Sequence, residues 1–231
     1  EHLRQRRIQA HFTASDVSTA LVMIARERAL KCIGPDRCDT LVCDLATADD
    51  LPRVLEEIAI PGAQRIITFF GLIPNFEPDA ILPSLAAMLQ PGDILLFSAN
   101  LAPGDDYGAG VERILPLYDN QLTRDWLMTF LTDLGVESSD GTLKFSIEEV
   151  NGLRRIAVHF EFTQSREIRI DAETFQFVPG ERFRLFFSYR HTPGTIRERL
   201  SREGIRIEEQ WIASSGEEGV FLCRKEGVIA G

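Results

Sequence analysis

The sequence has few cysteines and no long apolar run. Its four cysteines, Cys32, Cys38, Cys43 and Cys223, include no C-x-x-C pair. We therefore expect reduced packing residues rather than zinc ligands or disulfide partners. No apolar stretch approaches the ~18 residues that a membrane span requires, and the segment beginning at Glu1 has no signal-peptide pattern. These absences predict a cytoplasmic protein that has no membrane partner.

Positive charge is also in short supply. The chain has 25 Lys and Arg residues against 35 Asp and Glu residues, which gives a net charge of -10. A field of this sign repels phosphate backbones, so we expect no nucleic-acid partner. Because 44% of the residues are hydrophobic and 26% are charged, the composition is that of a folded globular protein.

Several catalytic signatures are missing. The glycines in 108–110 do not follow a strand pattern and lack the G-x-G-x-x-G spacing, which disfavours a dinucleotide-dependent oxidoreductase. No serine lies in a G-x-S-x-G elbow, which disfavours a serine hydrolase. His159 and His191 have no third ligand at a recognisable spacing, so we expect no metal site.

The first hundred residues alternate between two hydrophobic periods. Continuous apolar runs predict strands, and apolar residues at helical spacing predict helices between them. The predicted strands are 9–15, 40–43, 65–70 and 93–98, and the predicted helices are 17–32, 51–58 and 78–89. Strands that alternate with helices favour right-handed crossovers and a parallel sheet. We therefore predict an α/β fold with a doubly wound, Rossmann-like sheet.

Residues 101–190 do not continue this alternation. A long helical pattern at 111–134 is followed by short alternating strands within 143–188, which are typical of an antiparallel sheet. After a further helix, strands at 206–211 and 219–223 form a hairpin that could return to the first sheet. We expect residues 101–190 to be an inserted α+β domain for substrate recognition, and residues 1–100 and 191–231 to form the cofactor-binding domain.

Acidic residues follow two of the predicted strands. Asp16 comes after the first strand and Asp44 after the second. In a parallel α/β sheet, ligands bind beyond the carboxyl ends of the strands. There, one carboxylate can accept hydrogen bonds from ribose hydroxyls, and a second can face an adenine amino group. The alternative is structural: Asp16 could cap the helix that follows it, and Asp44 could be an ordinary loop residue.

Short segments along the chain occur in the order and spacing of a known family. They are Ser15-Asp16-Val17-Ser18, Val42-Cys43-Asp44-Leu45, Phe69-Phe70-Gly71-Leu72-Ile73-Pro74-Asn75-Phe76-Glu77-Pro78, Leu89-Gln90-Pro91-Gly92-Asp93, Leu117-Tyr118-Asp119-Asn120 and Phe187-Ser188-Tyr189-Arg190-His191-Thr192-Pro193. In these segments the chain resembles the histidine-specific, S-adenosylmethionine-dependent methyltransferases, the type that makes trimethylhistidine for ergothioneine. The resemblance extends from about residue 10 to residue 225.

The resemblance implies a cofactor site. Asp16 matches the acid that holds the ribose of S-adenosylmethionine, and Asp44 and Leu45 match the residues around its adenine ring. Gly71 lies in the segment near the amino acid part of the cofactor and its transferable methyl group. S-adenosylmethionine is therefore the expected cofactor.

The resemblance also implies a site for a small-molecule substrate. Asn75 and Tyr118 match the positions that grip the carboxylate and amino group of the substrate amino acid, and Ser188 matches one that lines its side-chain pocket. Phe186 stands where the family has an acid. Since a phenyl ring cannot accept a hydrogen bond from imidazole, the substrate is expected to differ from histidine. We predict methylation of the amino nitrogen of an amino acid, histidine-like or related, with Asn75 and Tyr118 as the catalytic candidates.

One family motif has no counterpart. The glycine-rich motif that follows the first strand of such enzymes does not occur in these 231 residues. The sequence therefore resembles a methyltransferase without its opening strand and helix. This leaves a second hypothesis open, in which the chain is a catalytically inactive methyltransferase-like domain that serves as a binding or interaction module.

Overall fold

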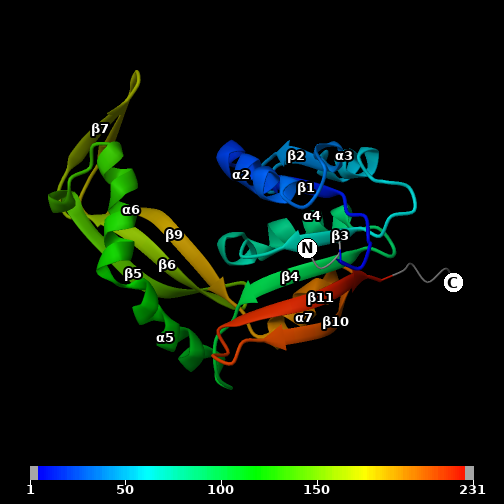
Figure 1. Ribbon diagram of the computed structural model, residues 1–231. Helices are drawn as coiled ribbons and strands as arrows, with labels where there is room; N and C mark the ends of the chain where they lie inside the picture. The colour runs from blue at the N-terminus through cyan, green and yellow to red at the C-terminus, as the bar shows by residue number, and fades with distance from the viewer. Residues whose placement is uncertain (1–4, 227–231) are drawn as a thin grey trace.

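The computed structural model describes residues 5–226 and has an α/β fold (Figure 1). Residues 1–4 and 227–231, the ends of the predicted cofactor-binding domain, lie outside the described part. The strands form four sheets, of two, four, three and two strands. Parallel and antiparallel pairings both occur.

The first sheet is a parallel pair, β1 (Phe12–Asp16) and β2 (Cys38–Val42). Helix α2 (Thr19–Leu30) joins the two strands and packs against both. Its first turn is capped by Ser18, whose Oγ accepts from the Leu21 amide at 3.4 Å. A short 3-10 turn, η1 (Pro35–Arg37), leads into β2. Strand–helix–strand order was predicted here and is confirmed.

The second sheet has the order β10-β11-β4-β3. Strands β3 (Ile66–Phe69) and β4 (Ile94–Asn100) are parallel, whereas β11 (Glu218–Lys225) is antiparallel to both β4 and β10 (Ile205–Ile212). The hairpin predicted near the carboxyl end therefore does return to an earlier strand.

The prediction of one parallel sheet is wrong, because the amino-terminal strands divide into two groups. Within residues 5–226, β1 pairs only with β2, and β3 pairs only with β4. One edge of β1 and one edge of β3 therefore carry backbone groups with no strand partner. Apolar side chains near these edges are half exposed, among them Ile66 at 53% and Phe70 at 49%.

The main core lies around the second sheet. Helices α3 (Leu51–Glu57) and α4 (Pro78–Met88) pack on each other, and α7 (Pro193–Arg202) packs on β10. The alternation in β4 buries Leu95, Phe97 and Ala99. These residues join one cluster with Leu85 of α4 and Ile196 of α7. The cluster also includes Phe69, so it holds the carboxyl ends of β3 and β4 in place.

Residues between β4 and α7 form a separate antiparallel sheet with helices beside it. Its order is β5-β6-β9, with β5 (Gly141–Val150), β6 (Leu153–Phe162) and β9 (Arg182–Arg190). A hairpin of β7 (Arg166–Ile170) and β8 (Glu173–Phe177) extends from it, and a 3-10 turn, η3 (Ser138–Asp140), precedes β5. Figure 1 shows this sheet projecting away from the four-stranded sheet.

The long helix predicted at 111–134 is two helices, α5 (Tyr107–Tyr118) and α6 (Gln121–Asp133). The break has a local cause. Pro116 supplies no backbone N–H in the last turn of α5, and the Asn120 side chain accepts from the Thr123 amide at 3.0 Å, which starts a new helix. Tyr118 therefore ends a helix instead of lying inside one.

The chain leaves the four-stranded sheet and returns to it at one point. Leu101, directly after β4, forms a parallel bridge with His191, directly after β9. The His191 amide donates to Asn100 O at 2.9 Å, and the Ala102 amide donates to His191 O at 2.8 Å. The start and the end of the intervening region are thus held side by side.

The unpaired strand edges predict fast amide exchange. In β1 and β3, the alternate N–H groups that point away from the partner strand are expected to exchange rapidly, because no backbone acceptor covers them. The amides of β4, which is paired on both sides, are the control and are expected to be the best protected. Residue-resolved hydrogen exchange by NMR measures both sets. Strong protection of the outward amides of β1 and β3 would contradict this description.

Candidate functional site

Asp16 and Asp44 follow adjacent parallel strands. Asp16 ends β1 and lies opposite Val42, and the Cys43 amide donates to Asp16 O at 3.1 Å. Each carboxylate also closes a local turn: Asp16 Oδ1 accepts from the Ser18 amide at 2.8 Å, and Asp44 Oδ1 accepts from the Ala46 amide at 2.9 Å. In each residue the other carboxylate oxygen accepts no hydrogen bond within the described chain and is free for a ligand.

Gly71 and Asn75 lie in the turn that follows β3. Gly71 has a φ of +70°, which favours glycine, and a Cβ placed there would meet nothing within 4 Å. Its amide donates to Ser98 Oγ of β4 at 2.8 Å. Asn75 ends the 3-10 turn η2 (Ile73–Asn75), and its Nδ2 donates to Phe187 O of β9 at 2.6 Å. This hydrogen bond ties the turn after β3 to the antiparallel sheet.

Tyr118, Phe186 and Ser188 come together in the antiparallel region. Tyr118 Oη and Ser188 Oγ are 3.0 Å apart, and Ser188 is buried. The rings of Tyr118 and Phe186 have centroids 5.7 Å apart, and Trp126 of α6 meets the same Phe186 ring edge-on at 6.2 Å. Residues 70 positions apart therefore form one cluster, in which a polar pair lies beside aromatic rings.

A charged network next to Asn75 holds the two sheets together. Glu77, which precedes α4, accepts from Tyr189 Oη at 2.6 Å and from Arg155 Nη1 at 2.8 Å. Arg155 is buried in β6 and also donates to Glu148 at 2.9 Å. Burial lowers the pKa of Arg155, but its hydrogen bond to Glu148 and the nearby negative charges raise it above the usual value overall. Burial, followed by the hydrogen bond to Glu77, raises the pKa of Tyr189 to about 12.

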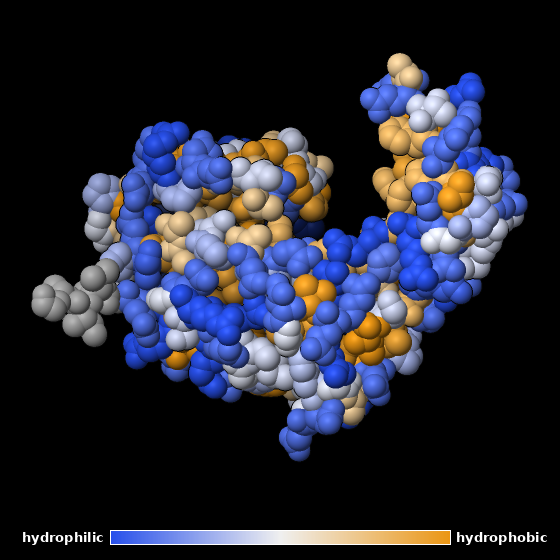
Figure 2. Space-filling view, turned by 180° about the vertical axis from the view of Figure 1, so that it is seen from behind, coloured by the Kyte–Doolittle hydropathy of each residue, from blue (hydrophilic) through white to orange (hydrophobic). Residues whose placement is uncertain are grey.

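The candidate residues form two groups that are not in direct contact. Asn75, Tyr118, Phe186 and Ser188 meet at β9, whereas no hydrogen bond or ion pair among residues 5–226 joins Asp16 or Asp44 to them. Figure 2 shows an open hollow between the projecting antiparallel region and the rest of the molecule. Tyr118, Phe186 and Ser188 belong to the projecting region, whereas Asn75 lies in the turn after β3 and reaches that region through its hydrogen bond to Phe187 O.

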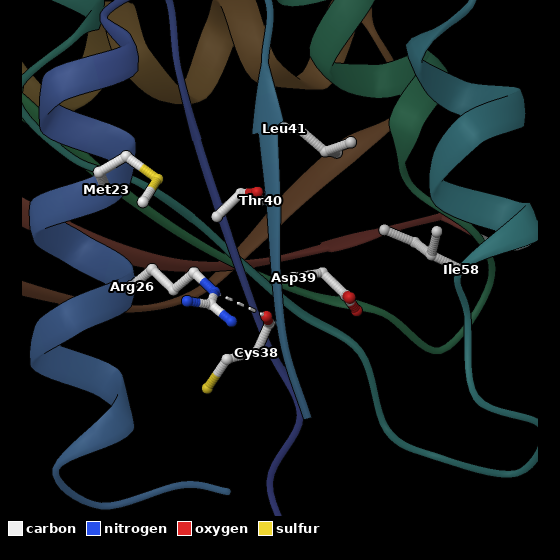
Figure 3. Close-up of a pocket in the computed structure, with 7 residues that line it drawn as sticks. All are labelled: Met23, Arg26, Cys38, Asp39, Thr40, Leu41 and Ile58. Carbon is white, nitrogen blue, oxygen red and sulfur yellow. Dashed lines mark hydrogen bonds between the residues drawn. The ribbon is translucent and has the colours of Figure 1, made fainter. Parts of the chain in front are cut away.

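A pocket of about 450 Å³ contains none of the predicted site residues. It is lined by residues of α2 and β2 together with Ile58, and the Arg26 side chain donates to Cys38 O within it (Figure 3). Cys38 precedes Asp44 by six positions, at the start of β2 rather than at its carboxyl end. The lining continues along β2 as far as Leu41, one residue before the strand ends, but it includes neither Asp16 nor Asp44.

Arg190 was missed by the sequence analysis. It is buried at the end of β9, and its Nη2 donates to Tyr118 Oη at 2.6 Å. The only sequence signal was its position, two residues after Ser188, which places both side chains on one face of the strand. Glu77, Arg155 and Tyr189 were also missed, because partners so distant in sequence leave no spacing pattern.

His191 is buried without a hydrogen-bond partner for either ring nitrogen within the described chain. Burial, and then the charges of Arg199 and Arg190, lower its pKa to about 3. The ring is therefore neutral at physiological pH. Its backbone, rather than its ring, joins β4 to β9.

The remaining candidates are metal-binding groups, membrane-spanning helices and cysteines. In residues 5–226 no group of three or more His, Cys, Asp or Glu side chains could hold a metal ion, and no helix is long and apolar enough to cross a membrane. All four cysteines are free; Cys38 and Cys223 are buried, as expected of packing residues, but Cys32 is exposed. Burial raises the pKa of the Cys223 thiol to about 12, which keeps it protonated.

Comparison with known families decides the classification. A family model described as histidine-specific methyltransferase, SAM-dependent, matches residues 1–225. The chain belongs to this family. S-adenosylmethionine is accordingly the cofactor of this methyltransferase. No curated protein matches the sequence significantly.

Solved structures with similar folds are distant from this methyltransferase. An S-adenosylmethionine-dependent methyltransferase from Clostridium acetobutylicum ATCC 824 is 12% identical, with 96% of this chain and 77% of that chain covered and a TM-score of 0.47. The CcbJ methyltransferase from Streptomyces caelestis is 11% identical over 97% and 78% of the two chains, with a TM-score of 0.43. The glycopeptide N-methyltransferase MtfA complexed with S-adenosyl-L-methionine is 17% identical over 92% and 76%, with a TM-score of 0.38.

The buried ring of His191 predicts acid sensitivity of the methyltransferase. Between pH 6.5 and about 3 the unfolded chain binds a proton at this ring and the folded chain does not, so stability falls on acidification through this window. The contribution is about 1.4 kcal/mol per pH unit. Urea unfolding from pH 7 to pH 4 is expected to show a smaller loss of stability for His191→Phe than for the wild type. The partly exposed His11 provides the control variant His11→Phe, and equal slopes for all three proteins would show that His191 is not the cause.

Proposed function

We propose that the chain methylates an amino nitrogen of a small amino-acid-like molecule, with cofactor held at Asp16 and Asp44 and substrate held at Asn75, Tyr118 and Ser188. The observation that carries the proposal is the hydrogen bond from Asn75 to Phe187 O, 2.6 Å long. It joins the turn beyond β3, where a ligand of an α/β sheet binds, to the strand that carries Ser188.

The donor and acceptor groups beyond β1, β2 and β3 fit the cofactor. The second carboxylate oxygen of Asp16 is open for ribose hydroxyls, and that of Asp44 is open for the adenine amino group. Leu45, which packs against the main core, would lie beside the adenine ring. The open space in front of Gly71 leaves room for the methionine part. The cofactor, when bound, supplies a sulfonium methyl group. These four residues would hold and orient it.

The substrate side offers polar groups on an aromatic background. Asn75 is exposed and presents its amide oxygen, since its nitrogen donates to Phe187 O. That oxygen can accept from a substrate amine, while Tyr118 and Ser188 can donate to a carboxylate. Phe186 and Trp126 provide apolar surface for the rest of the molecule. This combination supports an amino acid, or a related amine with an acidic group, as the substrate.

Alignment carries most of the expected catalysis. The bound cofactor would supply its methyl group to a neutral substrate amine, and the methylated nitrogen would then release a proton to solvent. No strong acid or base is required, and positioning of two reactants can lower a barrier by roughly 7 to 11 kcal/mol at the ideal limit. Asn75 would hold the amine toward the cofactor side, Tyr118 would hold the carboxylate, and the aromatic rings would exclude water.

The side chain of the preferred substrate is predicted from Phe186. This ring contacts Tyr118 and Trp126 and has no hydrogen-bonding group. An imidazole would find no acceptor there, whereas an apolar or aromatic side chain would stack. We therefore propose a histidine-related or aromatic amino acid instead of a strict preference for histidine. The proposed substrate-recognition region is 101–190.

Cofactor binding by the Asp16 variant tests the proposal. Asp16→Asn keeps an oxygen that can accept from the Ser18 amide but loses the charge that ribose hydroxyls favour. Its dissociation constant for S-adenosylhomocysteine is expected to rise about tenfold in calorimetry. The exposed Asp36 in η1 gives the matched control, Asp36→Asn, which is expected to bind as the wild type does.

Methyl transfer is then measured by mass spectrometry on a panel of free amino acids and their decarboxylated amines. Mass gain by one or more amino acids supports the proposal. Tight cofactor binding with no transfer to any of them would favour the binding module instead. Equal cofactor affinity in Asp16→Asn and the wild type would remove Asp16 from the site.

A further inference from the structure

Arg190 contacts Tyr118, the partner of Ser188. It ends β9, two residues after Ser188, and its guanidinium carbon is 5.4 Å from the centroid of the Tyr118 ring. Nη2 donates to Tyr118 Oη at 2.6 Å and Nη1 donates to Leu101 O at 3.3 Å. The side chain is buried, with a relative exposure of 7%. Its position is thus fixed by two hydrogen bonds and by the phenol ring.

The charge of Arg190 has no counter-ion among residues 5–226. The two other buried arginines in this region are paired: Arg155 with Glu77 and Glu148, and Arg199 with Asp79. Arg190 makes no such pair in the described chain, and its Nε has no partner there. A buried charge without a counter-ion is costly, and its field acts on the nearest polar groups. Here these groups are the Tyr118 hydroxyl and Leu101 O, and the Tyr118 hydroxyl in turn lies 3.0 Å from Ser188 Oγ.

The hydrogen bond from Arg190 also sets the direction of the Tyr118 proton. Arginine can only donate, so Tyr118 Oη is the acceptor of this bond. The phenolic hydrogen must then point elsewhere, to Ser188 Oγ or to an oxygen of a bound molecule. Because the guanidinium is positive and unpaired, a negatively charged oxygen is the acceptor that this arrangement favours most.

We propose that Arg190 is a positioning residue that holds Tyr118 as a hydrogen-bond donor toward a carboxylate of the substrate. The inference rests on the proposed function and narrows its substrate class to amines that carry an acidic group. Arg190 itself acts through Tyr118. Loss of its charge should therefore weaken recognition of the acid more than recognition of the amine.

Paired ligands test this role by binding alone. Calorimetry with L-histidine and histamine, and with L-phenylalanine and phenethylamine, gives the preference for each acid over the amine that lacks its carboxylate. The wild type is expected to prefer the acids, and Arg190→Gln is expected to reduce this preference about tenfold. Arg190→Lys, which retains the charge, should restore part of the preference. In a Tyr118→Phe background, Arg190→Gln should cause no further loss.

The matched control is Arg154, the cross-strand neighbour of Arg190 in β6. Its guanidinium also lies over a tyrosine, 5.9 Å from the centroid of Tyr107, but it pairs with Glu149 and is partly exposed. Arg154→Gln is expected to keep the wild-type preference. If circular dichroism shows that Arg190→Gln does not fold, Arg190→Lys and Tyr118→Phe test the role instead. The preference for the acid over the amine must persist in Arg190→Lys and disappear in Tyr118→Phe.

Three results would overturn the role of Arg190. They are an unchanged acid preference in Arg190→Gln, an unchanged preference in Tyr118→Phe, and no acid preference in the wild type. Failure of the proposed function gives a different pattern, since it appears as absence of S-adenosylhomocysteine binding or of methyl transfer in the wild type. If the protein transfers no methyl group but its preference for acids still depends on Arg190, the result would support the role of Arg190 and contradict the proposed methyltransferase activity.

Discussion

The attachment of the turn beyond β3 to strand β9 is the constraint on which the site depends. Asn75 donates to Phe187 O, and Glu77, two residues later, accepts from Arg155 and Tyr189 of the antiparallel sheet. Such charge-assisted bonds to a buried arginine are geometrically demanding, so they fix one sheet relative to the other. The substrate-side residues consequently occupy a defined position beside the end of the α/β sheet.

The buried arginines near this attachment differ in whether a carboxylate pairs with them. Arg155 and Arg199 have carboxylate partners and support the fold, whereas Arg190 has none in the described chain and faces a tyrosine. A protein interior tolerates an unpaired cation poorly, unless hydrogen bonds and a bound anion offset it. The contact of this cation with Tyr118 is the basis on which we propose an acidic substrate, and the uncharged ring of Phe186 is the basis of the proposed side-chain preference.

Much of the fold could be predicted from local pattern, and the site only in part. Apolar periodicity identified the strands and helices up to Asn100, because each is a local hydrophobic pattern. The break between α5 and α6 depended on the cap formed by Asn120, and the separation of β1 from β3 depended on which strands pair. The helix break and the strand pairing both depend on contacts that one short segment does not contain. Tyr118 and Ser188 came from family resemblance, whereas Arg190 and the Glu77 network required three-dimensional contacts.

We infer that the cofactor lies beside the attachment between the turn after β3 and strand β9. A crystal structure of the protein with S-adenosylhomocysteine and a substrate amino acid measures this position directly. We expect the ribose hydroxyls within hydrogen-bond distance of Asp16, the substrate amine between the cofactor sulfur and the Asn75 side chain, and the substrate carboxylate at Tyr118. Cofactor bound in the pocket of Met23, Arg26 and Cys38, or a substrate remote from β9, would contradict the account.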